Sequence, residues 1–457
     1  MTEKIILSSI QSDTIRMPEK ENKDFRPAFG GKFSGSLRVL GNEENTGNGL
    51  LFLGNYMALD HSRGAEVYLD ALKPHAVLIC GKRGYGKSYT MGCILEELAF
   101  LPEPIKDNLA SLTIDTMGIF WTMRNPNESE ARRLKSWELD PSGLKIEVFV
   151  PAGKVEAYKK RNIEVKPFSI SIRELSGSQW CRVLKIEEVS SLGVLLVRII
   201  ESLRERGEAY SFEDIINETF LDERSDPASK GATENYFRAV KSWGLFSKEG
   251  TPLSELVAGG RTTILDVSAL ENENVCAAAV SILAGRLYEE RLEARRIYEK
   301  KKMGEKIKGE EFPLVWLFID EAHIFLPAGK ESLASEVLIN RCLRQGRQPG
   351  LSLVLATQRP ASLHPDVVSQ SDLLICHRLT SSDDILALEA SRPLYMQESL
   401  RAYLKKMGSE RGAALIVDDH SESIHMVRIR PRRSWHGGGE PSALEPCRVE
   451  KEIKNQT

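Results

Sequence analysis

Residues 81–88 form a glycine-rich turn whose residue types and spacing suit a phosphate group. The turn reads GKRGYGKS and fits G-x-x-x-x-G-K-[ST] at every fixed position. Glycines let backbone N–H groups converge on an anion, and the N-terminus of a following helix attracts the same charge. We expect Lys87 to reach the β- and γ-phosphates of ATP and the Ser88 hydroxyl to bind Mg²⁺. The predicted nucleotide-binding residues are Gly81, Lys82, Arg83, Gly84, Tyr85, Gly86, Lys87, Ser88 and Tyr89.

Two acids follow an apolar run much later in the chain. The run Leu314–Ile319 ends at Asp320 and Glu321. We expect Asp320 to bind Mg²⁺ through Ser88 or water, and Glu321 to orient or polarise the attacking water. His323 completes the string D-E-A-H, and we interpret it as structural rather than catalytic.

A second apolar run ends in polar residues that suit a phosphate sensor. Leu353–Ala356 lead into Thr357 and Gln358, and Gln358 is predicted to touch the γ-phosphate and report its loss. Three arginines lie just before this run, at positions 341, 344 and 347. Arg347 is the preferred arginine finger for a neighbouring subunit, and Arg344 is the second choice. The alternative is a surface helix with ordinary salt bridges.

The elements that must position these residues are strands alternating with helices. Nearly continuous apolar runs at 76–80, 110–115, 261–270, 314–319 and 353–356 predict a parallel sheet covered on both faces, an α/β fold. We expect the ATPase core at residues 71–124 and 261–430. Residues 125–260 are predicted to be a mostly helical insertion. Residues 1–70 are predicted to hold an arm and a small β-rich, barrel-like region, and residues 431–457 a polar tail.

Composition limits the possible partners and compartments. The 457 residues carry a net charge of −3, so nucleic-acid contact needs a local basic stripe or a pore built by several subunits. The seven cysteines are scattered without metal-ligand spacing, which indicates a reducing compartment. No apolar run approaches a membrane span, and we expect a cytoplasmic protein without membrane contact.

Two charged stretches are candidates for nucleic-acid contact. The second half of the long helix expected from about Asn274 mixes acids and bases, which favours a solvated helix end over a DNA-facing surface. Arg428, Arg430, Arg432 and Arg433 form a candidate basic stripe near the C-terminus. Pairing of these arginines with acids of another subunit is an equally supported alternative.

With these residues in view, the chain resembles the HerA branch of the HerA/FtsK superfamily of ring-forming motor ATPases. The matching stretches are LICGKRGYGKSYT, LTIDTMGIFW, GGRTTILDVSAL, LFIDEAHIFLP and RQGRQPGLSLVLATQRPASLHPDVVSQSDLLICHRL. They span about residues 75–385. The chain departs from the family at Tyr85, where Ser or Ala is usual, and at Lys73-Pro74-His75, where an Arg-His pair usually precedes the strand.

The resemblance implies a RecA-like (ASCE) P-loop core with an extra strand between the P-loop strand and the strand that ends in acids. It also implies a homohexamer that hydrolyses ATP at subunit interfaces, with double-stranded DNA in its pore. Relatives typically work in DNA repair with a NurA-like nuclease or with another effector. We therefore expect a DNA translocase or helicase. The alternatives are an ATPase that acts as a scaffold or switch without processive translocation, and a secretion-type motor.

Overall fold

The computed structural model describes residues 37–42, 47–57, 63–307, 312–390, 395–396 and 398–439. The expected N-terminal arm and residues 440–457 of the predicted tail lie outside the described residues. No helix in these ranges is long and apolar enough to cross a membrane.

One mixed sheet runs through the molecule. Its 13 strands lie in the order β1-β3-β2-β15-β14-β13-β4-β12-β11-β5-β10-β6-β7. Their bounds are β1 Arg38–Leu40, β2 Leu50–Met57, β3 Arg63–Asp70, β4 Ala76–Cys80, β5 Leu109–Asp115, β6 Ile146–Pro151, β7 Lys166–Phe168, β10 Thr262–Asp266, β11 Leu314–Ile319, β12 Leu351–Thr357, β13 Leu373–Cys376, β14 Ala413–Asp418 and β15 Ser423–Ile429. Strands β8 (Ile170–Ser171) and β9 (Phe246–Ser247) form a separate parallel pair.

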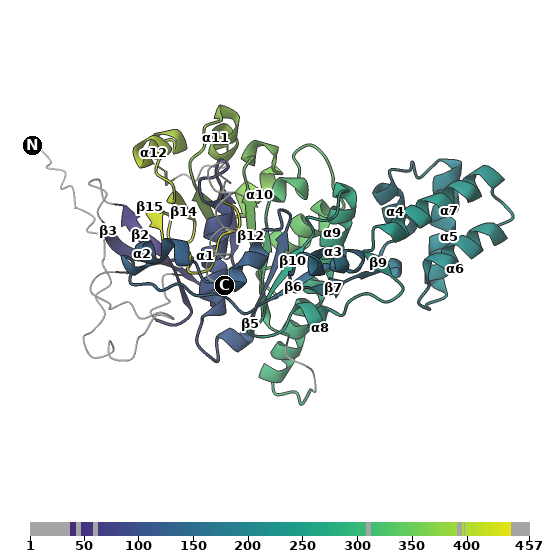
Figure 1. Cartoon of the computed structure of the whole chain (residues 1–457), viewed down its shortest axis with the longest axis horizontal. Coiled ribbons are helices and arrows are strands. Elements are labelled where there is room, and N and C mark those ends of the chain that lie inside the picture. Colours follow the sequence, from purple (N-terminus) through teal and green to yellow (C-terminus); the bar gives the residue numbers. More distant parts are fainter. Residues whose placement is uncertain are drawn as a thin grey trace, which may run out of the picture.

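Helices cover both faces of this sheet, with α1 packed on one face and α9 on the other. The helices of the described residues are α1 Lys87–Ala99, α2 Ala131–Lys135, α3 Val155–Lys159, α4 Gly177–Leu184, α5 Ser191–Glu205, α6 Phe212–Leu221, α7 Pro227–Ser242, α8 Leu253–Leu256, α9 Glu273–Lys302, α10 Pro365–Gln370, α11 Ser382–Glu389 and α12 Leu400–Met407. Val337–Leu343 form a π-helical turn. Figure 1 shows α4–α7 grouped at one end of the molecule, with β2, β3, β14 and β15 toward the other.

Alternation along β4 explains why both faces of the sheet are apolar. Val77 and Ile79 belong to the core cluster that includes the buried side of α1, whereas Leu78 belongs to the cluster that includes α9. Successive side chains of a strand point to opposite faces, so a strand buried on both sides reads as a continuous apolar run. The α/β fold predicted from these runs is therefore confirmed.

The centre of the sheet is parallel and sets the geometry of the site. Strand β12 lies between β4 and β11, and all three run in the same direction. Thr357 pairs with Cys80, which places Gln358 beside the start of the glycine-rich loop. The carboxyl ends of the three strands therefore meet at one edge, where ligands of open α/β sheets bind.

Two groups of strands differ from the sequence expectation. The N-terminal strands β1–β3 extend the central sheet through the antiparallel pair β2–β15, whereas a barrel-like region was expected. Strands β6 and β7, from within the predicted insertion 125–260, continue the same sheet beyond β10. Short runs such as these do not encode their pairing partners, because strand pairing depends on contacts distant in sequence. The helical part of the insertion is the group α4–α7.

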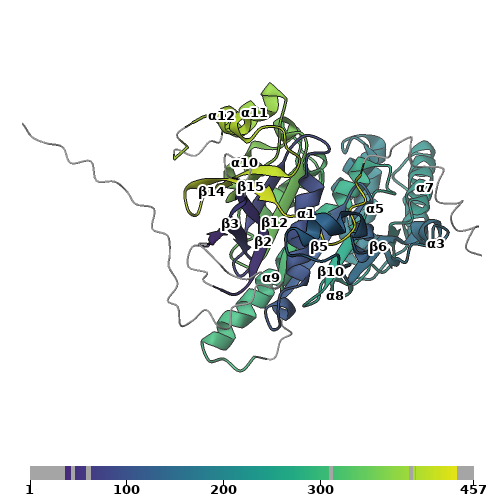
Figure 2. The ribbon, with the colours of Figure 1, turned by 60° about the vertical axis from the view of Figure 1, so that its left-hand side comes forward.

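Helix α9 changes character along its length. Its buried residues are concentrated between Val275 and Leu287, with Arg291 the last of them. The charged second half projects beyond the sheet in Figure 2. This arrangement agrees with a solvated helix end, because acids and bases alternate there without a buried face.

The segment after β15 is packed into the molecule. Arg430 and Arg432 are 0% and 1% exposed, and Arg433 is also buried. Arg430 contacts Glu96 Oε2 and Glu97 Oε1 of α1, each at 2.8 Å. Burial alone would raise the pKa of Glu96, but Arg430 and Arg432 reverse the effect and hold that pKa below its usual value.

The proposed basic stripe is therefore wrong for these three arginines. Arg430 and Arg432 neutralise the buried acids Glu96 and Glu97 of their own chain, and the Nε of Arg433 donates to the Asp140 carbonyl. All three are buried, so they do not present a cationic surface. Arg428 is partly exposed and pairs with Glu410. The expected polar tail is likewise corrected for residues 431–434, all of which are buried.

Replacing Arg430 by Met should destabilise the fold by about 3–5 kcal/mol, because Glu96 and Glu97 would stay buried without their main cation. Arg428→Met is the matched control, and it should cost less than about 1 kcal/mol because its ion pair is solvated. Urea unfolding followed by circular dichroism measures both. Equal losses for the two variants would contradict the buried-charge interpretation.

Candidate nucleotide-binding site

The glycine-rich loop joins the end of β4 to the start of α1. Gly86 has φ +122°, and a Cβ there would lie 3.1 Å from the ring of His377. Only glycine adopts this backbone readily, so the sequence forms a tight turn that aims α1 at the cleft. Lys82 N donates to the carbonyl of Arg378 at 2.8 Å, which fixes the loop to the chain after β13.

His377 supports this loop from behind. Its Nε2 lies 2.9 Å from Thr90 Oγ1 and its Nδ1 lies 2.9 Å from the Ala413 carbonyl. Burial lowers the pKa of His377 to about 4, so the ring is neutral at physiological pH. The Ala413 carbonyl can only accept, which places the ring proton on Nδ1 and leaves Nε2 to accept from Thr90.

Ser88 and the acids after β11 meet at the same edge. Ser88 Oγ donates to Asp320 Oδ2 at 3.1 Å, across 232 positions of sequence. Asp320 is 1% exposed, and burial raises its pKa. A hydroxyl and a carboxylate are the hard oxygen ligands that Mg²⁺ prefers, so this pair fits the predicted metal. In the described ranges no group of three or more His, Cys, Asp or Glu side chains is placed to hold a metal ion.

Glu321 is held in an unusual backbone conformation. Its φ is +49°, in the left-handed region that costs a non-glycine residue about 1–2 kcal/mol. Its Oε2 is buried and has no hydrogen-bond partner in the described structure, although His323 Nδ1 lies 3.4 Å away. Burial and the Asp320 charge raise the pKa of Glu321, which suits a residue that must accept a proton.

Lys87 and Gln358 complete the group around Glu321. Lys87 is 6% exposed, and burial lowers its pKa while Glu321 and Asp320 oppose that effect. The backbone of Gln358, just after β12, opposes part of the rise in the pKa of the Glu321 carboxylate. His323 Nδ1 lies 3.1 Å from Thr357 Oγ1, so this ring links the ends of β11 and β12 as a structural group.

These residues open onto a cleft with a volume of about 650 Å³. Of the predicted site, residues 83–89, Glu321 and Gln358 line it, whereas Gly81, Lys82 and Asp320 are not part of the lining. The other lining residues were not predicted from the sequence, namely Thr90, Met117, Ile119, Arg133, Arg411, Gly412, Ile429 and His436–Gly439. Met117 and Ile119 lie in the stretch LTIDTMGIFW, which matches the family, but no role in the site was assigned to them.

Arg347 lies at the opposite edge of the sheet. It precedes β12, whereas Gln358 follows that strand, and seven strand residues span roughly 20 Å. Its side chain is 53% exposed and contacts Asp372 Oδ1 at 3.2 Å. Arg344 pairs with Asp366 and Arg341 with Glu289. Arg347 is therefore too far from the phosphate loop of its own chain to act on it.

Asp372 joins Arg347 to a buried histidine. Asp372 Oδ2 lies 2.8 Å from His75 Nδ1, and Asp70 Oδ2 lies 3.5 Å from His75 Nε2. Burial lowers the pKa of His75, but the hydrogen bond with Asp372 and the nearby carboxylate of Asp70 outweigh it and raise that pKa to about 9. His75 is therefore a buried cation at neutral pH. It belongs to the stretch Lys73-Pro74-His75, where the family resemblance led us to expect an Arg-His pair.

A comparison with known protein families shows to which family this chain belongs. A family model described as "Helicase HerA, central domain" matches residues 51–287. The chain belongs to the HerA family. It carries the fold and the phosphate loop of a P-loop ATPase.

Individual relatives of HerA type cover smaller parts of the chain. The DNA double-strand break repair helicase HerA of Pyrococcus furiosus is 30% identical over 188 residues, which cover 37% of this chain and 33% of that protein. The probable HerA of Methanocaldococcus jannaschii is 34% identical over 125 residues, 27% of this chain and 24% of that one. The chain thus spans about a third or less of the length of these relatives.

Solved structures give distant matches. VirB4 of Thermoanaerobacter pseudethanolicus is 15% identical with a TM-score of 0.47, covering 88% of this chain and 99% of that one. The conjugative coupling protein TrwB is 11% identical with a TM-score of 0.46, covering 85% of this chain and 90% of that one.

Substitutions at the phosphate site should separate binding from turnover. Lys87→Ala should abolish nucleotide hydrolysis, because the phosphate charge loses its nearest cation. Glu321→Gln should keep nucleotide binding and lower turnover by on the order of 10²–10⁴, because it removes the proton acceptor and keeps Asp320. Phosphate release and calorimetric binding measure the two effects. Glu336→Gln, an exposed acid outside the cleft, is the control, and wild-type turnover by Glu321→Gln would contradict its assignment.

Proposed function

We propose that this chain is an ATP-driven double-stranded DNA translocase of HerA type that works as a hexameric ring in the cytoplasm. The observation that carries the ATP-hydrolysing part is the contact of Ser88 with Asp320, beside a buried Glu321 carboxylate with an unpartnered oxygen. Membership of the HerA family and the DNA-repair names of the relatives support the DNA part. A NurA-like nuclease or another effector is the proposed partner.

Each group of side chains in the site has a different role in ATP hydrolysis. The glycine-rich loop and Lys87 bind the phosphates, and Ser88 with Asp320 would hold Mg²⁺, which neutralises charge on the phosphates. Glu321 orients the attacking water and accepts its proton. Gln358, whose backbone contacts the Glu321 carboxylate, lies where it can sense whether the γ-phosphate is present.

The arginine finger has to come from another subunit. Arg347 is half exposed and lies a strand length away from its own phosphate loop. In a ring, the edge that carries Arg347 would face the nucleotide of the next copy. Asp372 holds the guanidinium in each chain until the γ-phosphate of the neighbour competes for it.

Duplex DNA should raise the rate of ATP hydrolysis, and the stimulation should fall between about 50 and 200 mM salt because phosphate contacts release counterions. Phosphate release with and without duplex DNA, and particle size in the same preparation, test this. Turnover that ignores DNA in a preparation of intact rings would instead favour a scaffold or switch ATPase.

Arg347→Ala and Glu321→Gln should each be nearly inactive, since a finger contributes on the order of 10³–10⁵ in rate. Mixed rings of the two variants should regain turnover, because an intact Glu321 can meet an intact Arg347 across one interface. Arg341→Ala is the matched control, since its side chain is similarly exposed and ion-paired. Inactive mixed rings, after tagged and untagged protein are shown to exchange, would exclude action in trans, and Arg344 would be tested next.

A further inference from the structure

The cleft continues well beyond the residues assigned to the phosphates. One side is formed by the glycine-rich loop with Glu321 and Gln358. Its lining also includes Arg133, Arg411 and the stretch His436–Gly439, which we call the far side because these residues lie beyond the phosphate loop and the acids. The volume of about 650 Å³ is much larger than a triphosphate group needs, and it suits a complete small-molecule ligand.

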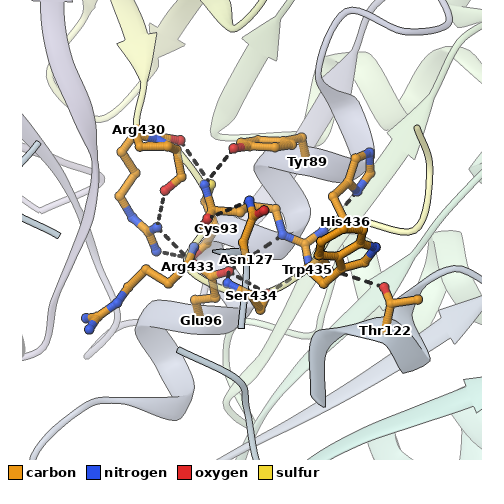
Figure 3. Close-up of polar contacts among 12 residues, drawn as sticks. Tyr89, Cys93, Glu96, Thr122, Asn127, Arg430, Arg433, Ser434, Trp435 and His436 are labelled. Atoms are coloured by element: carbon orange, nitrogen blue, oxygen red, sulfur yellow. Dashed lines mark hydrogen bonds and ion pairs between the residues drawn. The ribbon is translucent and has the colours of Figure 1, made fainter. Parts of the chain in front are cut away.

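The stretch that lines the far side is anchored from below by buried polar contacts (Figure 3). Glu96 of α1 accepts from Arg433 N at 3.1 Å and from Ser434 N at 2.8 Å and Oγ at 2.6 Å. Trp435 N donates to the Asn125 carbonyl at 2.8 Å. Because α1 begins in the phosphate loop, the same helix fixes the position of both sides of the cleft.

Arg432 sets the position of His436. This buried guanidinium donates to Ser434 Oγ at 2.9 Å and to the Trp435 carbonyl at 3.1 Å. Its Nη1 lies 3.1 Å from His436 Nδ1. The backbone N of Arg432 donates to the Tyr89 hydroxyl at 2.7 Å, and Tyr89 is a residue of the first turn of α1. Figure 3 shows Tyr89 and His436 on the same side of this network.

The His436 ring is held as a neutral hydrogen-bond donor. It packs edge-on against Tyr89, with ring centroids 5.4 Å apart. Burial and the Arg432 charge lower its pKa to about 4. Since a guanidinium only donates, Nδ1 is the acceptor and the ring proton lies on Nε2. A partly buried imidazole with an oriented N–H in the lining of a cleft is suited to a sugar hydroxyl or a base nitrogen.

The three glycines after His436 present backbone instead of side chains. Gly437 N donates to Thr122 Oγ1 at 3.1 Å, and a Cβ on Gly437 would lie 2.9 Å from the Thr122 methyl. A Cβ on Gly438 would lie 2.8 Å from the His436 ring. The glycines therefore allow the chain to pass closely over these side chains, and all three are exposed residues that line the cleft.

We propose that His436–Gly439 form the subsite for the sugar and base of the bound nucleoside triphosphate. This proposal rests on the proposed function, since it extends the same cleft from its phosphate end. The phosphates are held by the loop after β4, whereas the nucleoside contacts residues more than 300 positions later, fixed to α1 through Glu96.

Calorimetric titration of the full chain with ATP and with inorganic tripolyphosphate, both with Mg²⁺, separates the two ends of the cleft. Wild type should bind ATP at least about tenfold more tightly than tripolyphosphate. His436→Ala should weaken ATP binding by about five- to tenfold, the effect of losing one hydrogen bond and a packed ring. It should leave tripolyphosphate binding unchanged. Gly438→Ala, which displaces the His436 ring, should act in the same direction.

The matched control is Trp435→Ala, because Trp435 is exposed and outside the cleft lining. It should bind both probes as wild type does, and thermal melting should show all variants folded. Equal affinity of wild type for ATP and tripolyphosphate, or unchanged ATP binding by both His436→Ala and Gly438→Ala, would overturn the subsite. Failure of wild type to bind either probe would instead overturn the proposed function, as would unaltered binding of both probes by Lys87→Ala.

Discussion

Two glutamates in the interior of α1 impose the constraint on which much of the molecule depends. A buried carboxylate without a cation is strongly destabilising, so Glu96 and Glu97 require compensation close by. The chain supplies it from Arg430 and Arg432, and Arg430 also donates to the Phe52 carbonyl of β2. One charge network thus fixes the phosphate-binding helix, the N-terminal strands and the segment after β15 to one another.

The parallel strands at the centre of the sheet keep two groups of charged and polar side chains one strand length apart. At the carboxyl ends lie the phosphate loop, Asp320 and Glu321. At the amino ends lie the charged His75 and the Asp372–Arg347 pair. Strands β4 and β12 touch both edges, and a packed strand transmits displacement without stretching. In a ring-shaped motor, these strands would rigidly connect the nucleotide site of one subunit with the Arg347 that faces the nucleotide of the next subunit.

The parts of the structure that were predictable from sequence are those set by local chemistry. The glycine-rich turn, Asp320 and Glu321 were identifiable because phosphate and Mg²⁺ demand particular residue types at fixed spacing. The apolar runs identified the central strands for a similar reason. The partners of Arg430 and Arg432 were not identifiable, because Glu96 lies 334 positions before Arg430 and no local pattern relates the two stretches. The cleft residues Arg133 and His436 were missed for the same reason, since only the tertiary fold brings them to the site.

The long separation between Glu96 and Arg430 has a consequence for the order of events during synthesis. At about 5–20 residues per second, a ribosome needs roughly 20 to 70 s to make the intervening chain. Throughout that interval α1 carries two carboxylates whose cations do not yet exist. The helix therefore cannot settle into its final burial while the protein is being made from the N-terminus. Completion of the nucleotide cleft is thus a late event, after emergence of the chain beyond β15.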